Sequence, residues 1–423
     1  MEKERVWQTD GIPTVYGYKN PASHSFFLSL FLRAGALYGD EPIAGITHFL
    51  EHITIRNIDK TMGGELYSTL DKNGIEFNAS TYSEMVQFYI SGATEKLPLA
   101  IEIILRILSP ITLSADEIRR EGDRIKAEIR EGDERSSLAT FTSAIVYEGT
   151  PLEKTITGTL GDVSKINKSN LEKYRKSVFT RDNIFFYLTG NFLEGDIERL
   201  KLGLWEAMLP EGNIHESIAR VPSAFFHRTP SVKIKSADYT MLRMTFDIDM
   251  SVCGIAECDI LYDMLLGGYN SRLYIELSEK RGLCYDVSGA IERYKNIGTF
   301  TLSVELKERD VYEALEIILS ALCEMRERTF PSDALMRAGY VDNAYMLYDD
   351  ARELNFTFAY DNHIMDEGYA DLDQRRKRYA SVTPEAVRET AENIFKRENM
   401  TVTLKGNKRR LDTDRINKIL GDF

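Results

Sequence analysis

An internal repeat restricts the fold of this chain more than any other feature of its sequence. The stretch from Ile166 reads INKSNLEKYRKSVFTRDNIFFYLTGN, and the stretch from Val382 reads VTPEAVRETAENIFKRENMTVTLKGN. The two align without a gap at an offset of 216 positions, close to half of the 423 residues. Each copy has the pattern of an amphipathic helix, a turn and a strand that ends in Gly-Asn. The repeating unit is therefore a whole domain, and two similar domains are expected.

Each half combines strands in hairpin-like pairs with runs of helices. In the first half the patterns predict strands at 25–33, 75–79 and 85–91 and helices at 43–56, 64–72, 95–108, 114–133 and 136–147. In the second half they predict strands at 231–235, 241–247, 286–293 and 299–305 and helices at 256–266, 271–280, 311–328 and 332–366. This alternation indicates α+β domains, in which helices cover a largely antiparallel sheet.

The junction between the two domains is expected at residues 210–230. Prolines, a glycine and polar residues gather there without hydrophobic periodicity, which is typical of a linker. We therefore predict a first domain over 1–209 and a second, homologous domain over 231–423.

Charge and hydropathy exclude several classes of partner. The chain carries 53 Lys and Arg against 66 Asp and Glu, a net charge of −13, whereas a nucleic-acid binder needs a basic surface to displace counterions. The acidic excess also disfavours docking on an anionic membrane, and no apolar run reaches the roughly 20 residues of a membrane-spanning helix. The 4 cysteines form no Cys-x-x-Cys pair, and the opening MEKERVWQTD has no apolar segment. Reduced cysteines, no signal peptide and a cytoplasmic location are expected.

The sharpest chemical signal is the pentapeptide HFLEH, residues 48–52, in a stretch that is expected to be helical. His48 and His52 are four residues apart, so both imidazoles project from one face of the helix and reach one metal ion. Glu51 lies at the edge of that face, where it can contact a metal-bound water without ligating the metal. The order H-x-x-E-H is the reverse of the zinc-peptidase motif H-E-x-x-H.

A catalytic zinc site needs a third protein ligand and one open position for water. The predicted helix 114–133, in the same half, offers two carboxylates, Glu121 and Glu128, which are seven residues apart and share one face. Ile125 and Ile129 lie beside them, and a buried carboxylate on such a face requires a partner. The spacing alone does not separate Glu121 from Glu128.

Several segments together resemble one family over nearly the whole chain. GITHFLEH, GIEFNASTYSEMVQFY, AEIREGDE, LLGGYNSRLYIELSEKRGLCYDV and the closing VTPEAVRETAENIF with NMTVTLKGN are similar to the pitrilysin and mitochondrial-processing-peptidase family of zinc metallopeptidases, in its bacterial two-domain short form. The resemblance implies two similar α+β domains joined by a linker. It also implies a chamber around the peptide, built from two such pairs.

The resemblance assigns the ligands that the spacing leaves open. The family's third ligand follows its second histidine by about 76 residues, which corresponds to Glu128, and its accessory glutamate corresponds to Glu121. His48, His52 and Glu128 would then hold one Zn²⁺ per chain. Glu121 would support a ligating histidine from the next layer of residues.

The chemistry that follows is hydrolysis of a peptide bond. Zinc lowers the pKa of a bound water to about 7 and polarises the scissile carbonyl, and Glu51 would carry the proton from that water to the leaving amine. Asn78 and Ala79 lie on a predicted strand that, in the family, is an exposed edge pairing with the substrate. Such main-chain pairing binds many sequences.

The second half departs from this pattern. At the offset of the repeat, His48 falls on Met264, so no second metal site is expected. Family members carry an Arg and a Tyr, seven residues apart, that hold the substrate at the zinc. Tyr285 matches the Tyr, whereas Ser278 stands at the position of the Arg.

The absent Arg predicts a division of labour. This chain would supply zinc and base, and a homologous partner would supply the domain that bears the Arg and Tyr; a homodimer is the second choice. Lys280 or Arg281 would have to act from helical directions roughly 200° and 300° away from that of position 278. The sequence thus predicts a zinc endopeptidase for peptides or for leader and precursor segments. The alternative is a non-catalytic structural or peptide-binding subunit, and nothing favours another hydrolase such as an amidase.

Overall fold

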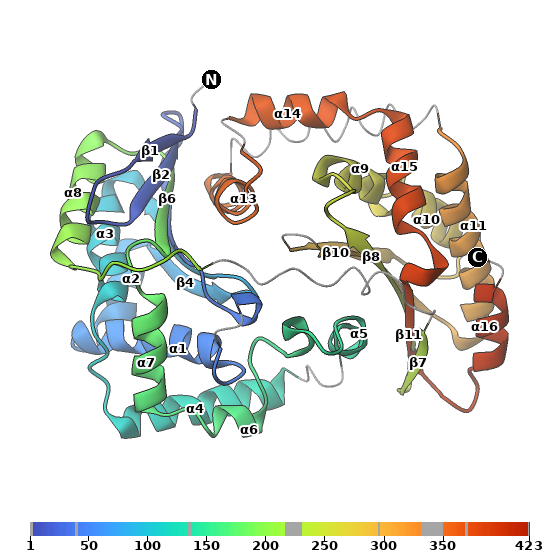
Figure 1. The fold of residues 1–423 in the computed structure, drawn as a ribbon, viewed down its shortest axis with the longest axis horizontal. Coiled ribbons are helices and arrows are strands. Elements are labelled where there is room, and N and C mark those ends of the chain that lie inside the picture. Colours follow the sequence, from blue (N-terminus) through green and yellow to red (C-terminus); the bar gives the residue numbers. More distant parts are fainter. Residues whose placement is uncertain are drawn as a thin grey trace. The chain divides into compact units, whose positions relative to one another are not determined.

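The computed structural model describes residues 3–38, 41–132, 137–215, 231–294, 297–330, 350–368, 371–421 and 423. The chain forms two compact units (Figure 1). Unit 1 comprises Met1–Glu134, Lys154–Ile218 and Tyr345–Leu372. Unit 2 comprises Arg135–Glu153, Ala219–Ala344 and Asp373–Phe423.

Each unit is built on one sheet whose strands are mostly antiparallel. Within the described ranges, the sheet of unit 1 has six strands in the order β1 (Arg5–Trp7), β2 (Thr14–Lys19), β6 (Ile184–Gly190), β3 (Ser25–Leu32), β5 (Val86–Ala93) and β4 (Glu76–Thr81). The described part of unit 2 has five, in the order β7 (Ser231–Ser236), β11 (Met400–Gly406), β8 (Thr240–Asp249), β10 (Ile297–Leu306) and β9 (Val287–Arg293). β2 pairs with β6 and β7 with β11 in parallel, and the other neighbours are antiparallel.

The two strand orders correspond through the repeat. The order β2-β6-β3-β5-β4 in unit 1 matches β7-β11-β8-β10-β9 in unit 2, and the offset of 216 carries Ile184, where β6 begins, onto Met400, where β11 begins. The predicted α+β class, with two similar domains built on largely antiparallel sheets, is confirmed.

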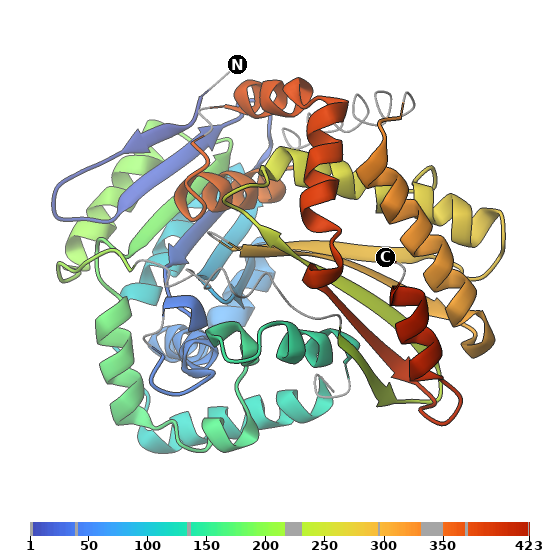
Figure 2. The same ribbon diagram turned by 45° about the vertical axis from the view of Figure 1, so that its right-hand side comes forward.

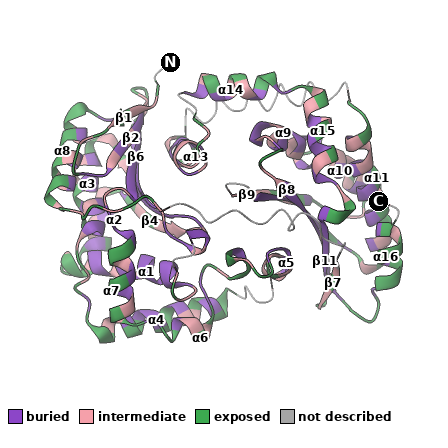
Figure 3. Ribbon diagram, viewed as in Figure 1, coloured by how far each residue is buried: buried purple, intermediate pink, exposed green. Residues whose placement is uncertain are grey.

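Helices cover the sheets. Unit 1 contains α1 (Ile46–Thr61), α2 (Leu66–Asn73), α3 (Leu97–Leu105), α4 (Ala115–Glu131), α6 (Leu160–Val163), α7 (Lys168–Val178), α8 (Glu194–Glu206) and α13 (Ala351–His363). Unit 2 contains α5 (Leu138–Val146), α9 (Ile255–Leu266), α10 (Arg272–Tyr274), α11 (Val311–Glu327), α15 (Pro384–Ile394) and α16 (Thr413–Gly421), and α14 (Leu372–Ser381) begins at the last residue of unit 1. In Figure 3 the strands are largely buried, while the helices expose their outer faces.

The sheet of unit 1 is apolar on both faces because both faces are covered. Leu28 and Leu30 of β3 belong to the large core that includes α1, α3 and α7, whereas Phe31 of the same strand joins a second core with Phe358 of α13. Successive side chains of a strand point to opposite faces. The long apolar run of β3 therefore reflects burial on both faces.

The two halves of the sequence exchange one helix each. Helix α13, from the second half, packs on β3 and β6 of unit 1, and α5, from the first half, packs on β8 and β11 of unit 2 (Figures 1 and 2). The two helices are equivalent in the repeat, since Leu354 of α13 lies 216 positions after Leu138 of α5. Unit 1 therefore needs a segment far from its own half of the sequence.

Asn355 fixes α13 on the sheet of unit 1. Its buried side-chain amide donates to the backbone oxygens of Phe27 at 3.1 Å and Tyr187 at 2.9 Å, and the Ser29 hydroxyl donates to its oxygen at 2.7 Å. We expect Asn355→Ala to lower the free energy of unfolding of unit 1 by about 2–4 kcal/mol, because several buried polar groups lose their partners.

Tryptophan fluorescence measures this loss selectively. Both tryptophans of the chain, Trp7 and Trp205, lie in unit 1, so a urea titration followed at their emission reports on that unit. Glu353→Ala, on an exposed position of the same helix, is the matched control and should change the free energy by about 0.5 kcal/mol or less. Equal losses in the two variants would contradict the anchoring role of Asn355.

The structure differs from the predicted elements in places. Strands β1 and β2 are additional, and the expected helix at 271–280 is one turn of α10 followed by a π-helix, Ile275–Glu279. Of the expected helix at 332–366, α13 is described, and 331–349 lie outside the described residues, as do 216–230 of the expected linker. In the described ranges, no helix combines the length and apolarity that crossing a bilayer requires.

Candidate metal centre

Gly45 sets the start of α1. It adopts a left-handed conformation with φ of 82°, and a Cβ atom there would lie 2.4 Å from the backbone oxygen of Thr157. Another residue would therefore strain both the backbone and this contact. Ile46 and Phe49 bury one side of the helix in the core.

Helix α4 carries the carboxylates and is fixed at its start and middle. Ser114 caps it, with its hydroxyl accepting the Glu117 N–H at 3.3 Å while Glu117 accepts the Ser114 N–H at 2.7 Å. Gly122 lets α4 approach α1 closely, since a Cβ atom there would lie 3.2 Å from the Phe49 ring. The close approach brings the acidic face of α4 to the histidine face of α1.

The ligand atoms of His48, His52 and Glu128 all lie within 4.8 Å of one another. His48 Nε2 is 3.6 Å from Glu128 Oε1, and His52 Nε2 is 3.4 Å from Glu128 Oε2. Two atoms that each bind zinc at about 2.1 Å in a tetrahedron are about 3.4 Å apart. The three side chains therefore fit one zinc ion.

Glu121 supports His52 from behind. Its carboxylate is buried and lies 3.1 Å from His52 Nδ1, and it also accepts hydrogen bonds from Arg56 at 3.0 Å and Arg124 at 3.1 Å. A carboxylate with these donors is held in one orientation, which directs Nε2 of His52 towards Glu128. Sequence reasoning found Glu121 but missed Arg56 and Arg124, whose spacing, four after His52 and three after Glu121, places them on the same helix faces.

The charges of the site suit a divalent cation. Burial, and then the charge of His52, lower the pKa of His48 to about 3. Burial would also lower the pKa of His52, but the hydrogen bond to Glu121 and the nearby carboxylates raise it overall. Arg56 and Arg124 form ion pairs with Glu121. Within the described part of the chain no Lys or Arg pairs with Glu128, so its negative charge is available to a cation.

Glu51 stands beside the ligands without joining them. It is 8% exposed, and burial raises the pKa of its carboxyl group. Its Oε2 accepts a hydrogen bond from the hydroxyl of Thr81, at the end of β4. Sequence reasoning did not single out Thr81, because the contact joins residues 30 positions apart.

One pocket of about 660 Å³ brings most of the expected site residues together. It is lined by His48, Glu51, His52, Asn78, Ala79, Glu121 and Glu128, with Tyr67 and Ile156 among its apolar walls. Strand β4, which carries Asn78, is the edge of the sheet, as expected. The backbone N–H of Ala79 donates to the side-chain oxygen of Asn78 at 2.9 Å, so this N–H already has a hydrogen-bond acceptor.

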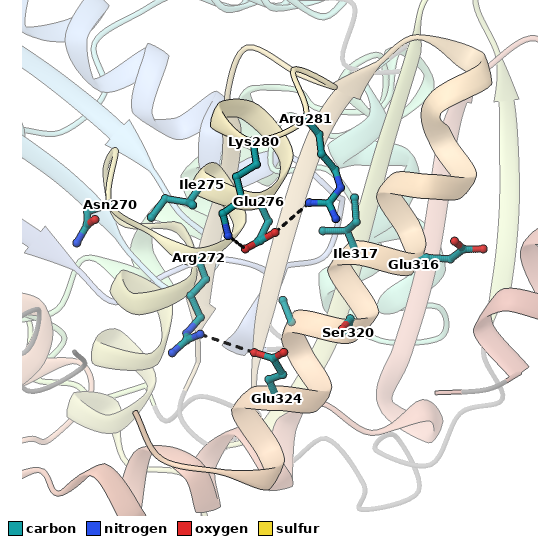
Figure 4. Close-up of a pocket in the computed structure, with 11 residues that line it drawn as sticks. Asn270, Arg272, Ile275, Glu276, Lys280, Arg281, Glu316, Ile317, Ser320 and Glu324 are labelled. Atoms are coloured by element: carbon teal, nitrogen blue, oxygen red, sulfur yellow. Dashed lines mark hydrogen bonds and ion pairs between the residues drawn. The ribbon is translucent and has the colours of Figure 1, made fainter. Parts of the chain in front are cut away.

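The remaining expected residues lie in unit 2. Met264 of α9 is buried in the core of unit 2, and Tyr285 is 94% exposed. The Ser278 hydroxyl donates to the Tyr285 carbonyl at 3.3 Å. In Figure 4, Lys280 and Arg281 both reach Glu276, at 2.5 and 3.0 Å. Both cations considered as substitutes for the absent Arg are thus paired.

A second pocket, of about 580 Å³, lies between the π-helix and α11 of unit 2 (Figure 4). Lys280 and Arg281 belong to its lining, and so does a third cation, Arg272, which lies 3.8 Å from Glu324. Cations and carboxylates in this pocket therefore balance one another, and it has no cluster of metal-ligating groups among the described residues.

Glu121→Gln is expected to weaken zinc binding by about 10–100-fold, because an amide orients the ligating His52 less firmly than a carboxylate does. Competition with a chromogenic chelator measures the change. Asp123→Asn, on the exposed face of the same helix, is the matched control and should leave the affinity unchanged. An unchanged affinity in Glu121→Gln would contradict the supporting role.

Comparison with known proteins matches this chain to two family models. A family model described as insulinase (peptidase family M16) matches residues 14–160, and one described as the peptidase M16 inactive domain matches 165–338, so together they span more than half of the chain. An uncharacterized zinc protease of Mycobacterium bovis is 24% identical over 67% of this chain, and the match covers 65% of that relative, just under two thirds of its length. Another from Streptomyces coelicolor is 24% identical over 89% of this chain and 84% of the relative.

Solved structures share the fold. The peptidase M16 inactive domain from Pseudomonas fluorescens superposes with a TM-score of 0.84 at 16% identity, over 96% of this chain and 98% of that one. A chain of complex III2 from Candida albicans does so with a TM-score of 0.79 at 12% identity, over 98% and 99%. The resemblance read from the sequence is confirmed by the two family models, and the chain belongs to peptidase family M16.

Proposed function

We propose that this chain is a zinc-dependent endopeptidase that works in the cytoplasm as the catalytic subunit of a dimer. Its substrates are peptides, or the leader and precursor segments of proteins, held in a chamber. The observation that carries the proposal is the convergence of His48, His52 and Glu128 on one point beside the buried Glu51. The description of relatives as zinc proteases supports it.

The residues of the chain have separate tasks in this reaction. When bound, zinc supplies a Lewis acid that polarises the scissile carbonyl and acidifies a water molecule. Glu51 takes the proton of the attacking water and delivers it to the leaving amine. Burial raises the pKa of Glu51, which brings it closer to the neutral range where a proton carrier works best. Glu121 keeps His52 in the orientation that ligation requires.

The substrate would bind as an added strand. β4 is the edge of its sheet and ends beside Glu51, so an extended peptide on β4 would lie across the pocket. Asn78 would release the N–H of Ala79 when a substrate carbonyl takes its place. Pairing of this kind reads the backbone and accepts many sequences.

A homologous partner would complete the site. Ser278 stands where the family places an Arg, Tyr285 is exposed, and Lys280 and Arg281 are engaged by Glu276. A partner subunit with the Arg and Tyr would therefore hold the substrate, and a homodimer is the second choice.

The same departure at Ser278 favours a second function, a non-catalytic structural or peptide-binding subunit. To separate the two, the chain is purified alone and with a homologous subunit that carries the Arg and Tyr, and hydrolysis of a library of unfolded peptides is measured with and without a chelator. The proposed function predicts chelator-sensitive hydrolysis with the partner present. Zinc-loaded protein that hydrolyses nothing in either form would support the non-catalytic subunit.

A further inference from the structure

We propose that Thr81 is the positioning residue of Glu51 and joins the substrate-binding edge of the sheet to the proton carrier. The inference rests on the proposed function, since it assigns Thr81 a part in that reaction. It concerns a residue of the pocket lining whose hydroxyl donates to Glu51 and which is not one of the three converging ligands.

The contact with Thr81 gives the two carboxylate oxygens of Glu51 different surroundings. Oε2 accepts the Thr81 hydroxyl, while Oε1 receives no hydrogen bond from any residue that the structure describes, although Glu51 lines the pocket. The terminal torsion of a glutamate side chain is broad and weakly restricted. A single fixed donor therefore holds the carboxylate at one rotation and leaves Oε1 available to the water.

Thr81 is itself held in place by the hairpin that it ends. It pairs with Val86 across β4 and β5, and the turn is closed by the Tyr82 N–H donating to the Met85 oxygen at 2.8 Å. Leu37 N–H also donates to the Ser83 oxygen at 3.0 Å, which ties the turn to the segment before α1. The hydroxyl therefore has a defined position before any substrate binds.

The hairpin is supported from the α13 side as well. The ring of Phe356 lies 5.7 Å from that of Tyr82, and the Tyr360 hydroxyl donates to Glu84 in the turn. These contacts are one helical turn apart on α13, so one stripe of the helix runs along the turn. The end of β4 is thus fixed from several directions.

The geometry connects binding to chemistry along a single strand. Ala79 and Thr81 are two residues apart and point to the same face of the sheet, the face that α1 covers. The side chain of Thr81, the last residue of β4, holds Glu51. A substrate peptide that pairs with β4 would therefore be aligned by the same strand that positions Glu51. Loss of the hydroxyl should therefore slow the proton transfer and leave substrate binding nearly intact.

Thr81→Val tests the inference, because it keeps the shape of the side chain and removes the hydroxyl. With partner and zinc present, we expect kcat to fall by about 10–100-fold while KM changes by about twofold or less. Thr81→Ser, which restores the hydroxyl, should return kcat to within about threefold of the wild type. Thr69→Val, at a half-buried threonine of α2, is the matched control and should leave both constants unchanged.

A merely structural threonine gives a different pattern. A kcat in Thr81→Val equal to the wild type would overturn the inference, and so would a Thr81→Ser variant as slow as Thr81→Val. Thr81→Ala replaces Thr81→Val if the latter does not fold, with zinc content and thermal unfolding measured on every variant.

Crystal structures of the variants give a readout that needs no turnover. The Glu51 carboxylate should turn away from its wild-type orientation in Thr81→Val and keep it in Thr81→Ser, and an unmoved carboxylate in Thr81→Val would contradict the inference. If the wild type hydrolyses peptides but Thr81→Val is fully active, the inference fails and the proposed function stands. If the wild type is inactive while the carboxylate turns as expected, the proposed function fails and the positioning contact stands.

Discussion

Glu51→Gln should reduce kcat/KM for peptide hydrolysis by about 10²–10⁴-fold, the usual contribution of a general acid–base group. The substitution keeps the shape of the side chain and its acceptor for the Thr81 hydroxyl, but it removes the ability to carry a proton. Because Glu51 is not one of the three converging ligands, zinc content should stay at about one ion per chain. Loss of turnover with retained metal would separate the proton carrier from the ligands.

The matched control for this variant lies on the same helix. Asp59→Asn makes the same chemical change in α1 two turns further along, where the side chain accepts the Leu66 N–H at 3.3 Å. It should retain wild-type hydrolysis and zinc. Hydrolysis in Glu51→Gln at the level of Asp59→Asn would show that another group moves the proton.

Glu128→Ala is expected to remove the metal and, with it, the activity. A catalytic zinc site uses three protein ligands, and the remaining His48 and His52 would release the ion during desalting. Metal analysis should find about one zinc per chain in the wild type and close to none in the variant. Hydrolysis should fall to the background of the chelated enzyme.

A thermal measurement tests the same ligand without any substrate. An ion that binds only the folded protein raises the free energy of unfolding, by about 4 kcal/mol when the free ion is at a thousandfold excess over Kd. The unfolding temperature rises accordingly. Added zinc should therefore raise the unfolding temperature reported by Trp7 and Trp205 in the wild type and in Glu131→Ala, an exposed position of the same helix. It should have no effect in Glu128→Ala, and an equal rise there would place the zinc elsewhere.

Local patterns predicted the parts of the site that lie on one helix. The four-residue spacing of His48 and His52 fixes their shared face, and the seven-residue spacing of Glu121 and Glu128 does the same on α4. The choice of Glu128 as the ligand came from the family resemblance. The geometry of the site supports the choice, since Glu128 faces both Nε2 atoms and Glu121 faces Nδ1 of His52.

Contacts between distant segments could not be predicted in this way. The hydroxyl of Thr81 reaches Glu51 because β4 packs against α1, and no periodicity in the sequence predicts that contact. The sequence also could not predict the exchange of α5 and α13 between the two units. The pattern of an amphipathic helix shows which of its faces is buried, but it does not show which of two similar sheets covers that face. The π-helix at Ile275–Glu279 has the same periodic pattern as an ordinary helix over so short a stretch.

The most direct test of the proposed zinc site is anomalous diffraction at the zinc absorption edge, from crystals of the chain grown with zinc. We predict one strong anomalous peak per chain in unit 1, about 2.0–2.2 Å from His48 Nε2, His52 Nε2 and a carboxylate oxygen of Glu128. The nearest oxygen of Glu51 should lie beyond bonding distance of that peak. A zinc peak away from these three side chains, or none in fully zinc-supplemented crystals, would contradict the proposal.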